Sequence, residues 1–108
     1  MSADLLRTSL TRLDRQLAPW SAARYAVELP SGLTAGATVH ALAQTLADLA
    51  AAAEGQPLRP VPRIGDPALR DQLTVLAHDL LAAAPDDEAT LSVAAEAIRT
   101  TARTLDGH

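Results

Sequence analysis

Hydrophobic residues recur along most of this chain at alternating intervals of three and four residues, which is the spacing of one face of an α-helix. Proline or glycine interrupts the pattern and leaves four segments: 3–18, 38–54, 67–84 and 87–105. Leucine supplies most of the apolar positions, for example Leu6, Leu10, Leu13 and Leu17, then Leu69, Leu73, Leu76 and Leu80. The pattern therefore predicts four amphipathic helices.

A proline-rich connector, residues 56–66, separates the second predicted helix from the third. Proline fixes φ and lacks the backbone donor, so no helix can cross this segment. Asp66 and Pro67 suit the start of the next helix, as cap and first-turn residue. We expect the connector to be an ordered strap across the helices. The apolar residues expected to hold it are Leu58, Val61 and Ile64.

Together these elements predict an all-α protein with a single domain over residues 1–108. The expected architecture is a compact four-helix bundle, made of two helical hairpins that the proline-rich connector joins. Leucine and alanine favour helix, and the β-branched and aromatic residues that strands prefer are scarce. A short extra helix is possible around 20–27, and Thr34 or Thr38 can cap the second long helix.

Composition excludes several kinds of chemistry. The chain has no cysteine, and all nine of its basic residues are arginine. Disulfides, thiolate catalysis, zinc–cysteine sites, Schiff-base chemistry and a Walker-type phosphate loop are therefore excluded. The net charge of −4 argues against attraction to nucleic acid, and no apolar run approaches the ~20 residues of a membrane span. We expect a soluble cytoplasmic protein with no cofactor and neither a nucleic-acid nor a membrane partner.

Two histidines are the first candidates for chemistry. His40 shares a helical stripe with Gln44 and Asp48, and His78 shares a face with Asp71. Di-metal sites in helical bundles use a Glu-x-x-His pair on each of two helices, and this chain has none. We interpret the stripe that contains His40 as a solvated polar face and predict no metal ligand and no catalytic residue. A chemical role for either histidine stays open.

Candidate partner-binding residues lie in two places. Trp20, Arg24 and Tyr25 are of the types enriched at binding hot spots, although Trp20 could instead fill one end of a leucine core. One helical turn separates Trp20 from Arg24, which allows a cation–π contact. Arg59 and Arg63 are the positive charges of the connector. They could bind a partner's carboxylates or, as we favour, those of this protein's own helices.

The function expected from these observations is that of a small non-enzymatic protein acting through protein–protein contacts, as a homodimer or as an accessory or regulatory subunit. The pairs Leu5–Leu6 and Leu80–Leu81 widen two apolar stripes, and surface left uncovered would mark an interface. The alternative is a small-molecule-binding or enzymatic bundle with a pocket near Trp20, Arg24 and His40, which requires convergent polar groups in a cavity.

Overall fold

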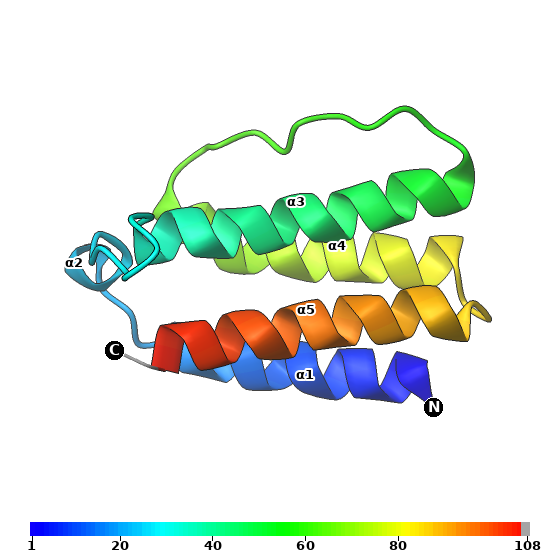
Figure 1. The fold of residues 1–108 in the computed structure, drawn as a ribbon, viewed down its shortest axis with the longest axis horizontal. Coiled ribbons are helices and arrows are strands. Elements are labelled where there is room, and N and C mark those ends of the chain that lie inside the picture. The colour runs from blue at the N-terminus through cyan, green and yellow to red at the C-terminus, as the bar shows by residue number, and fades with distance from the viewer. Residues whose placement is uncertain (107–108) are drawn as a thin grey trace.

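The computed structural model describes residues 1–106 and shows a four-helix bundle (Figure 1). Its long helices are α1 (Ser2–Leu17), α3 (Ala35–Glu54), α4 (Leu69–Ala83) and α5 (Glu88–Asp106). The short helix α2 (Ala22–Tyr25) precedes α3, and a single 3₁₀ turn (Asp66–Ala68) precedes α4. Within this described part there is no β-strand, only an isolated bridge between Glu28 and Thr34. The prediction of an all-α bundle is confirmed.

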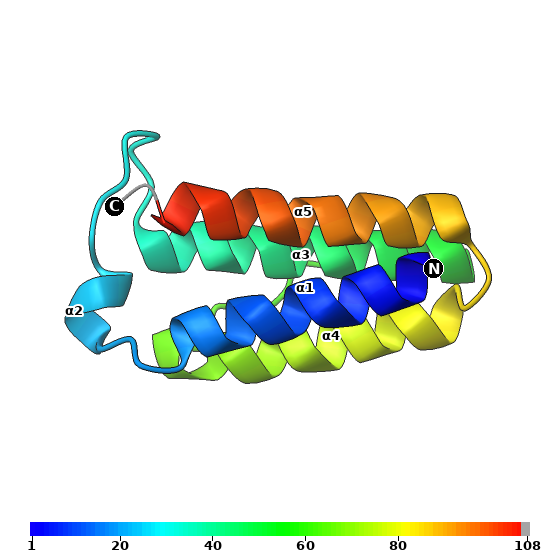
Figure 2. The same cartoon turned by 90° about the horizontal axis from the view of Figure 1, so that it is seen from below.

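The helices do not pair as two hairpins. Helix α1 packs most closely on α5, and α3 packs most closely on α4. Further contacts of α3 with α5 and of α1 with α4 place the four helices at the corners of a square. Figures 1 and 2 show that α3 and α4 run in the same direction, opposite to α1 and α5. Helices that follow one another along the chain, α1 and α3 or α4 and α5, therefore lie diagonally across the bundle. Two hairpins would require them to be neighbours.

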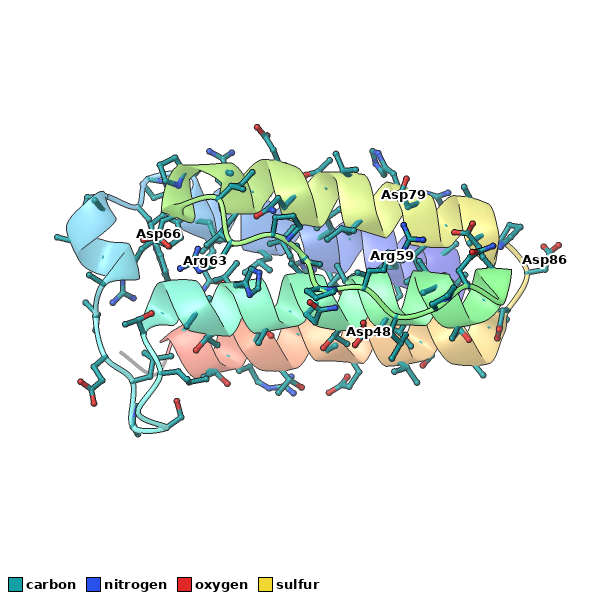
Figure 3. The ribbon with its side chains drawn as sticks, turned by 90° about the horizontal axis from the view of Figure 1, so that it is seen from above. Asp48, Arg59, Arg63, Asp66, Asp79 and Asp86 are labelled. Carbon is teal, nitrogen blue, oxygen red and sulfur yellow. The ribbon has the colours of Figure 1, made fainter. Side chains whose placement is uncertain are left out.

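The parallel arrangement of α3 and α4 explains the length of the proline-rich connector. The 20 residues of α3 span about 30 Å at ~1.5 Å per residue, and the chain must return over that length before α4 begins. The segment 56–65, which we call the strap, covers about 31 Å at the ~3.1 Å rise of polyproline II backbone. Figure 3 shows the strap running along the seam between α3 and α4. Its prolines keep it extended enough to make the return.

Helix α3 begins three residues earlier than the predicted residue 38, because Thr34 and not Thr38 caps it. The Thr34 hydroxyl accepts a hydrogen bond from the Ala37 N–H at 3.0 Å. At the other end, Gly55 stops the helix in the left-handed conformation, with φ of 67°. Both ends follow ordinary capping chemistry.

Asp66 does not cap the next helix as expected. The 3₁₀ turn has no side-chain cap, and the Asp66 carboxylate instead accepts a hydrogen bond from Arg63 Nη2 at 2.6 Å. Asp66 also lies against the start of α3, because a Cβ added to Gly36 would stand 2.5 Å from Asp66 Oδ1. Glycine at position 36 thus allows the 3₁₀ turn that follows the strap to dock beside the first turn of α3.

The core lies between the four long helices and consists mainly of leucine. Side chains of the predicted stripes that are fully buried include Leu6, Leu13, Leu17, Leu46, Leu73, Leu80, Leu91 and Ile98. Buried alanines such as Ala43 and Ala77 let the helices approach closely. Of the paired leucines expected to widen the stripes, only Leu5 is exposed, so no broad leucine patch remains there. Among residues 1–106, no helix is both long and apolar enough to cross a membrane.

Candidate interaction groove

Polar side chains of α3 hold the strap in place. The Gln44 amide pairs with the strap backbone as a neighbouring strand would: its Nε2 donates to Arg59 O at 3.0 Å, and its Oε1 accepts from the Val61 N–H at 2.8 Å. His40 Nε2 lies 2.9 Å from Val61 O. Because a carbonyl only accepts, the His40 Nε2 must carry a proton. The interpretation of these residues as a solvated polar face is therefore wrong.

A third side chain, from α4, also binds the strap: Gln72 Nε2 donates to Pro62 O at 2.9 Å. The apolar residues expected to hold the strap contribute less. Val61 is half-buried and packs on the core, but Leu58 and Ile64 are 64% and 67% exposed. Prolines leave the strap with carbonyls that no regular structure satisfies, so amide and imidazole donors on the helices take that role.

An apolar groove of about 530 Å³ lies between the strap and α4. Pro60, Pro62 and Ile64 form its strap side, and Val75 and Leu76 are the large apolar residues on the α4 side. Val75 is an apolar residue on the outer face of α4, where its side chain is 57% exposed. Sequence reasoning missed this groove, although an apolar residue between Asp71 and Asp79 was a signal for it.

Charged residues stand along the rim of this groove. Asp71 and Arg59 line it directly, and a second hollow of about 430 Å³ extends it past Glu54 and Asp79. Arg59 lines both hollows, and Figure 3 shows it between the strap and α4. None of the ion pairs found within residues 1–106 includes Arg59. The rim thus combines three carboxylates with one guanidinium that forms no ion pair in this part of the chain.

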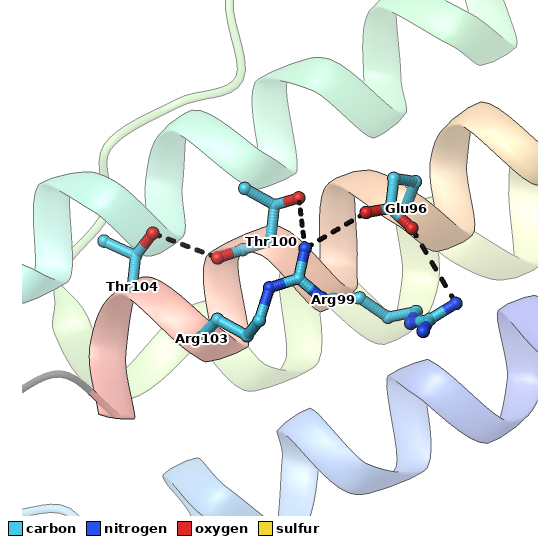
Figure 4. Close-up of polar contacts among 5 residues, drawn as sticks. All are labelled: Glu96, Arg99, Thr100, Arg103 and Thr104. Atoms are coloured by element: carbon cyan, nitrogen blue, oxygen red, sulfur yellow. Dashed lines mark hydrogen bonds and ion pairs between the residues drawn. The ribbon is translucent and has the colours of Figure 1, made fainter.

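The outer face of α5 differs from this rim, because its charges pair with one another. Arg103 Nη2 lies 3.1 Å from Glu96 Oε1 and 3.3 Å from the Thr100 hydroxyl, and Arg99 Nη1 lies 3.7 Å from Glu96 Oε2 (Figure 4). Exposed pairs of this kind contribute little to stability but leave few charges available to a partner. The groove is therefore the stronger candidate surface.

The aromatic residues come together at one end of the bundle. The guanidinium of Arg24 lies 4.6 Å from the centre of the Trp20 ring, which is the predicted cation–π contact. Trp20 meets Tyr25 edge to face with ring centres 5.1 Å apart, and Arg24 Nη2 donates to Leu105 O at 3.4 Å. Tyr25 is only 5% exposed, and Trp20 is half-buried and packs against the core, so these two aromatic side chains cover one end of the core.

The remaining candidate residues lie apart. Arg63 pairs with Asp66, as the intramolecular interpretation predicts, whereas Arg59 forms no such pair with any residue from 1 to 106. His78 is exposed on α4, and no group of three or more histidine or acidic residues among residues 1–106 could hold a metal ion. The hollow that Trp20 lines includes neither Arg24 nor His40, so the three residues of the alternative pocket are not brought together there.

Comparisons with protein-family models, with curated proteins and with solved structures found no match to this chain. Its functional interpretation therefore rests on the groove itself. An open site with apolar walls and charged edges is suited to binding the apolar side chains of another molecule while its edges select for charge.

Proposed function

We propose that this protein is a non-enzymatic binding module, an accessory or regulatory subunit, whose groove beside the strap takes a segment of a partner protein. The observation that supports this most is a concave place with exposed apolar side chains on both of its walls. Val75 and Ile64 are each more than half exposed and face a groove of about 530 Å³. Apolar surface gathered in this way is typical of interaction sites.

Charge on the rim indicates the chemistry of the partner. Asp71, Asp79 and Glu54 outnumber Arg59, so the surroundings of the groove are acidic. A segment with apolar residues at its centre and lysine or arginine on its flanks complements that pattern, whereas an acidic segment would be repelled. A two-fold dimer that joined groove to groove would bring together two rims that both carry more carboxylates than guanidinium groups. We therefore favour a basic, amphipathic segment of another protein over self-association.

Selection of peptides displayed on phage against the purified protein tests this proposal. The selected sequences should share apolar residues flanked by lysine or arginine. Val75→Glu places a charge on the groove wall without touching the core, and we expect peptide affinity, measured by fluorescence anisotropy, to fall at least about tenfold. Val93→Glu is the matched control, since Val93 is 54% exposed on α5, far from the groove, and should bind peptides like the parent protein.

Three results would contradict the proposal. The first is a selection that yields no binding peptide, and the second is equal affinity for the parent protein and Val75→Glu. The third comes from light scattering after size exclusion. A parent protein that is dimeric, together with a monomeric Val75→Glu variant, would assign the groove to self-association.

A further inference from the structure

A smaller hollow of about 180 Å³ lies at the end of the bundle where α1, α2 and the beginning of α4 meet. It is separate from the groove beside the strap. Its lining includes two aromatic residues, one carboxylate and one guanidinium: Trp20, Tyr25, Asp66 and Arg70. At ~30 Å³ per water molecule it has room for about six waters, which is the size of a small amino acid rather than of a nucleotide.

Tyr25 brings a phenol hydroxyl to the lining of this hollow. The residue is 5% exposed, yet its hydroxyl makes no hydrogen bond with any residue in the described part of the chain. Among these residues, the only fully enclosed side-chain atom without a partner is Gln72 Oε1, so Tyr25 Oη keeps some contact with open space, and Tyr25 is one of the residues that line this hollow. Buried phenols usually have a partner. Burial raises the pKa of Tyr25, so the hydroxyl stays neutral and can both donate and accept.

The two charged residues of the lining are fixed by ion pairs that leave part of each group unused. Arg70 donates from Nε to Asp14 Oδ1 at 2.9 Å and from Nη2 to Asp14 Oδ2 at 3.1 Å, which leaves Nη1 without a protein partner in residues 1–106. Asp66 accepts from Arg63 through Oδ1 and keeps Oδ2. A held donor and a held acceptor are preorganised for a ligand.

We propose that this hollow binds a small zwitterion of amino-acid size. The ligand carboxylate accepts hydrogen bonds from Tyr25 Oη and Arg70 Nη1, and its ammonium group donates to Asp66 Oδ2. An apolar ligand would cover these polar groups without pairing them, and an ion with one charge would meet a like charge in the lining. A zwitterion avoids both penalties, because it offers one negative group to the donors and one positive group to the acceptor. The site is independent of the groove and of its protein partner.

Trp20 supplies the assay, because it is the only tryptophan of the chain and it lines the hollow. Its fluorescence is to be followed while the non-aromatic standard amino acids are added one at a time, with acetate and methylammonium as singly charged controls. We expect a saturable change for at least one small amino acid and affinities at least about tenfold weaker for both controls. Tyr25→Phe keeps the ring packing and removes only the hydroxyl, so it should weaken binding about tenfold.

The outcomes are distinct. The Val75→Glu variant of the groove should bind the amino acid as tightly as the parent protein. No saturable change with any amino acid would overturn the proposal and indicate that water alone occupies the hollow. Equal affinity for acetate and the amino acid would also overturn it, in favour of a simple anion site. Unchanged affinity in Tyr25→Phe, with circular dichroism showing an intact fold, would remove the hydroxyl from the site.

Discussion

Replacing Gln44 by alanine is expected to release the strap while the four-helix core stays folded. The side chain makes two hydrogen bonds to the strap backbone, at Arg59 O and Val61 N–H, and a third to Asp48 Oδ1 within its own helix. Alanine has a higher helix propensity than glutamine, so the substitution does not weaken α3 itself. Its effect should therefore fall mainly on the strap.

The expected size of the effect follows from the bonds lost. Each neutral hydrogen bond contributes a net ~1 kcal/mol, so the two bonds to the strap stabilise its docked state by about 2 kcal/mol. Since ~1.4 kcal/mol corresponds to a factor of ten, the released population should rise about 30-fold. Release should still be partial, because His40 and Gln72 keep their bonds to Val61 O and Pro62 O.

Limited digestion with trypsin measures this release. Within the strap, the bond after Arg63 is cleavable, whereas the bond after Arg59 precedes Pro60 and resists the enzyme. Cleavage that is slow compared with reclosing follows the open population, so Gln44→Ala should be cut after Arg63 about 30-fold faster. Gln16→Ala is the matched control. Gln16 also makes two hydrogen bonds, to Ala102 O and Asp106 Oδ1, but none to the strap.

Two results would refute the reasoning about Gln44. If Gln44→Ala is cleaved after Arg63 no faster than Gln16→Ala, the glutamine does not hold the strap. Thermal unfolding followed by circular dichroism measures the loss of global stability in Gln44→Ala. If the rate of cleavage rises only in proportion to that loss, the strap unfolds together with the core. In that case the strap is not a separate docked segment.

Two further predictions concern backbone packing and pH. Gly36→Ala should lower the free energy of unfolding by about 1–3 kcal/mol and so lower the urea midpoint, since the new Cβ meets Asp66 Oδ1 at 2.5 Å. A raised midpoint, the usual result for glycine to alanine in a helix, would contradict it. Hydrogen bonds from Thr90 lower the pKa of Asp87, so its stabilisation is present above about pH 4 and lost as pH falls through the lowered pKa. In Asp87→Asn, Tm should fall less on acidification than in the parent protein. An unchanged dependence of Tm on pH would show that the Asp87 carboxylate does not contribute this stabilisation.

The helices could be predicted from the sequence because periodic leucines and flanking prolines leave little choice. Which helices are neighbours could not be predicted, since an apolar stripe does not specify which other stripe it contacts. The connector held a clue to this arrangement. A hairpin between antiparallel helices needs only a few residues, whereas ten extended residues match the length of the 20-residue helix α3. That match favours a crossover between parallel neighbours.

The residues that hold the strap were harder to recognise. His40 and Gln44 lie one turn apart on α3, and a polar pair at this spacing looks the same whether water or a backbone segment satisfies it. The useful clue was in the strap itself, because a proline-rich segment keeps its carbonyl acceptors but loses donors. Such a segment therefore needs donors on the facing helix, and Gln44 Nε2 and His40 Nε2 donate to its carbonyl groups.

The same contacts link the fold of the strap to the proposed function. Pro60, Pro62 and Ile64 form one side of the groove only while the strap is docked, so the docked population sets the fraction of molecules able to bind a partner. Apparent affinity scales with that fraction. A strap that is docked nearly all the time does not weaken binding, and Gln44→Ala would weaken peptide binding only if the released form became a major species. Strap release and partner affinity thus depend on one equilibrium, whereas Val75→Glu acts on the groove wall alone.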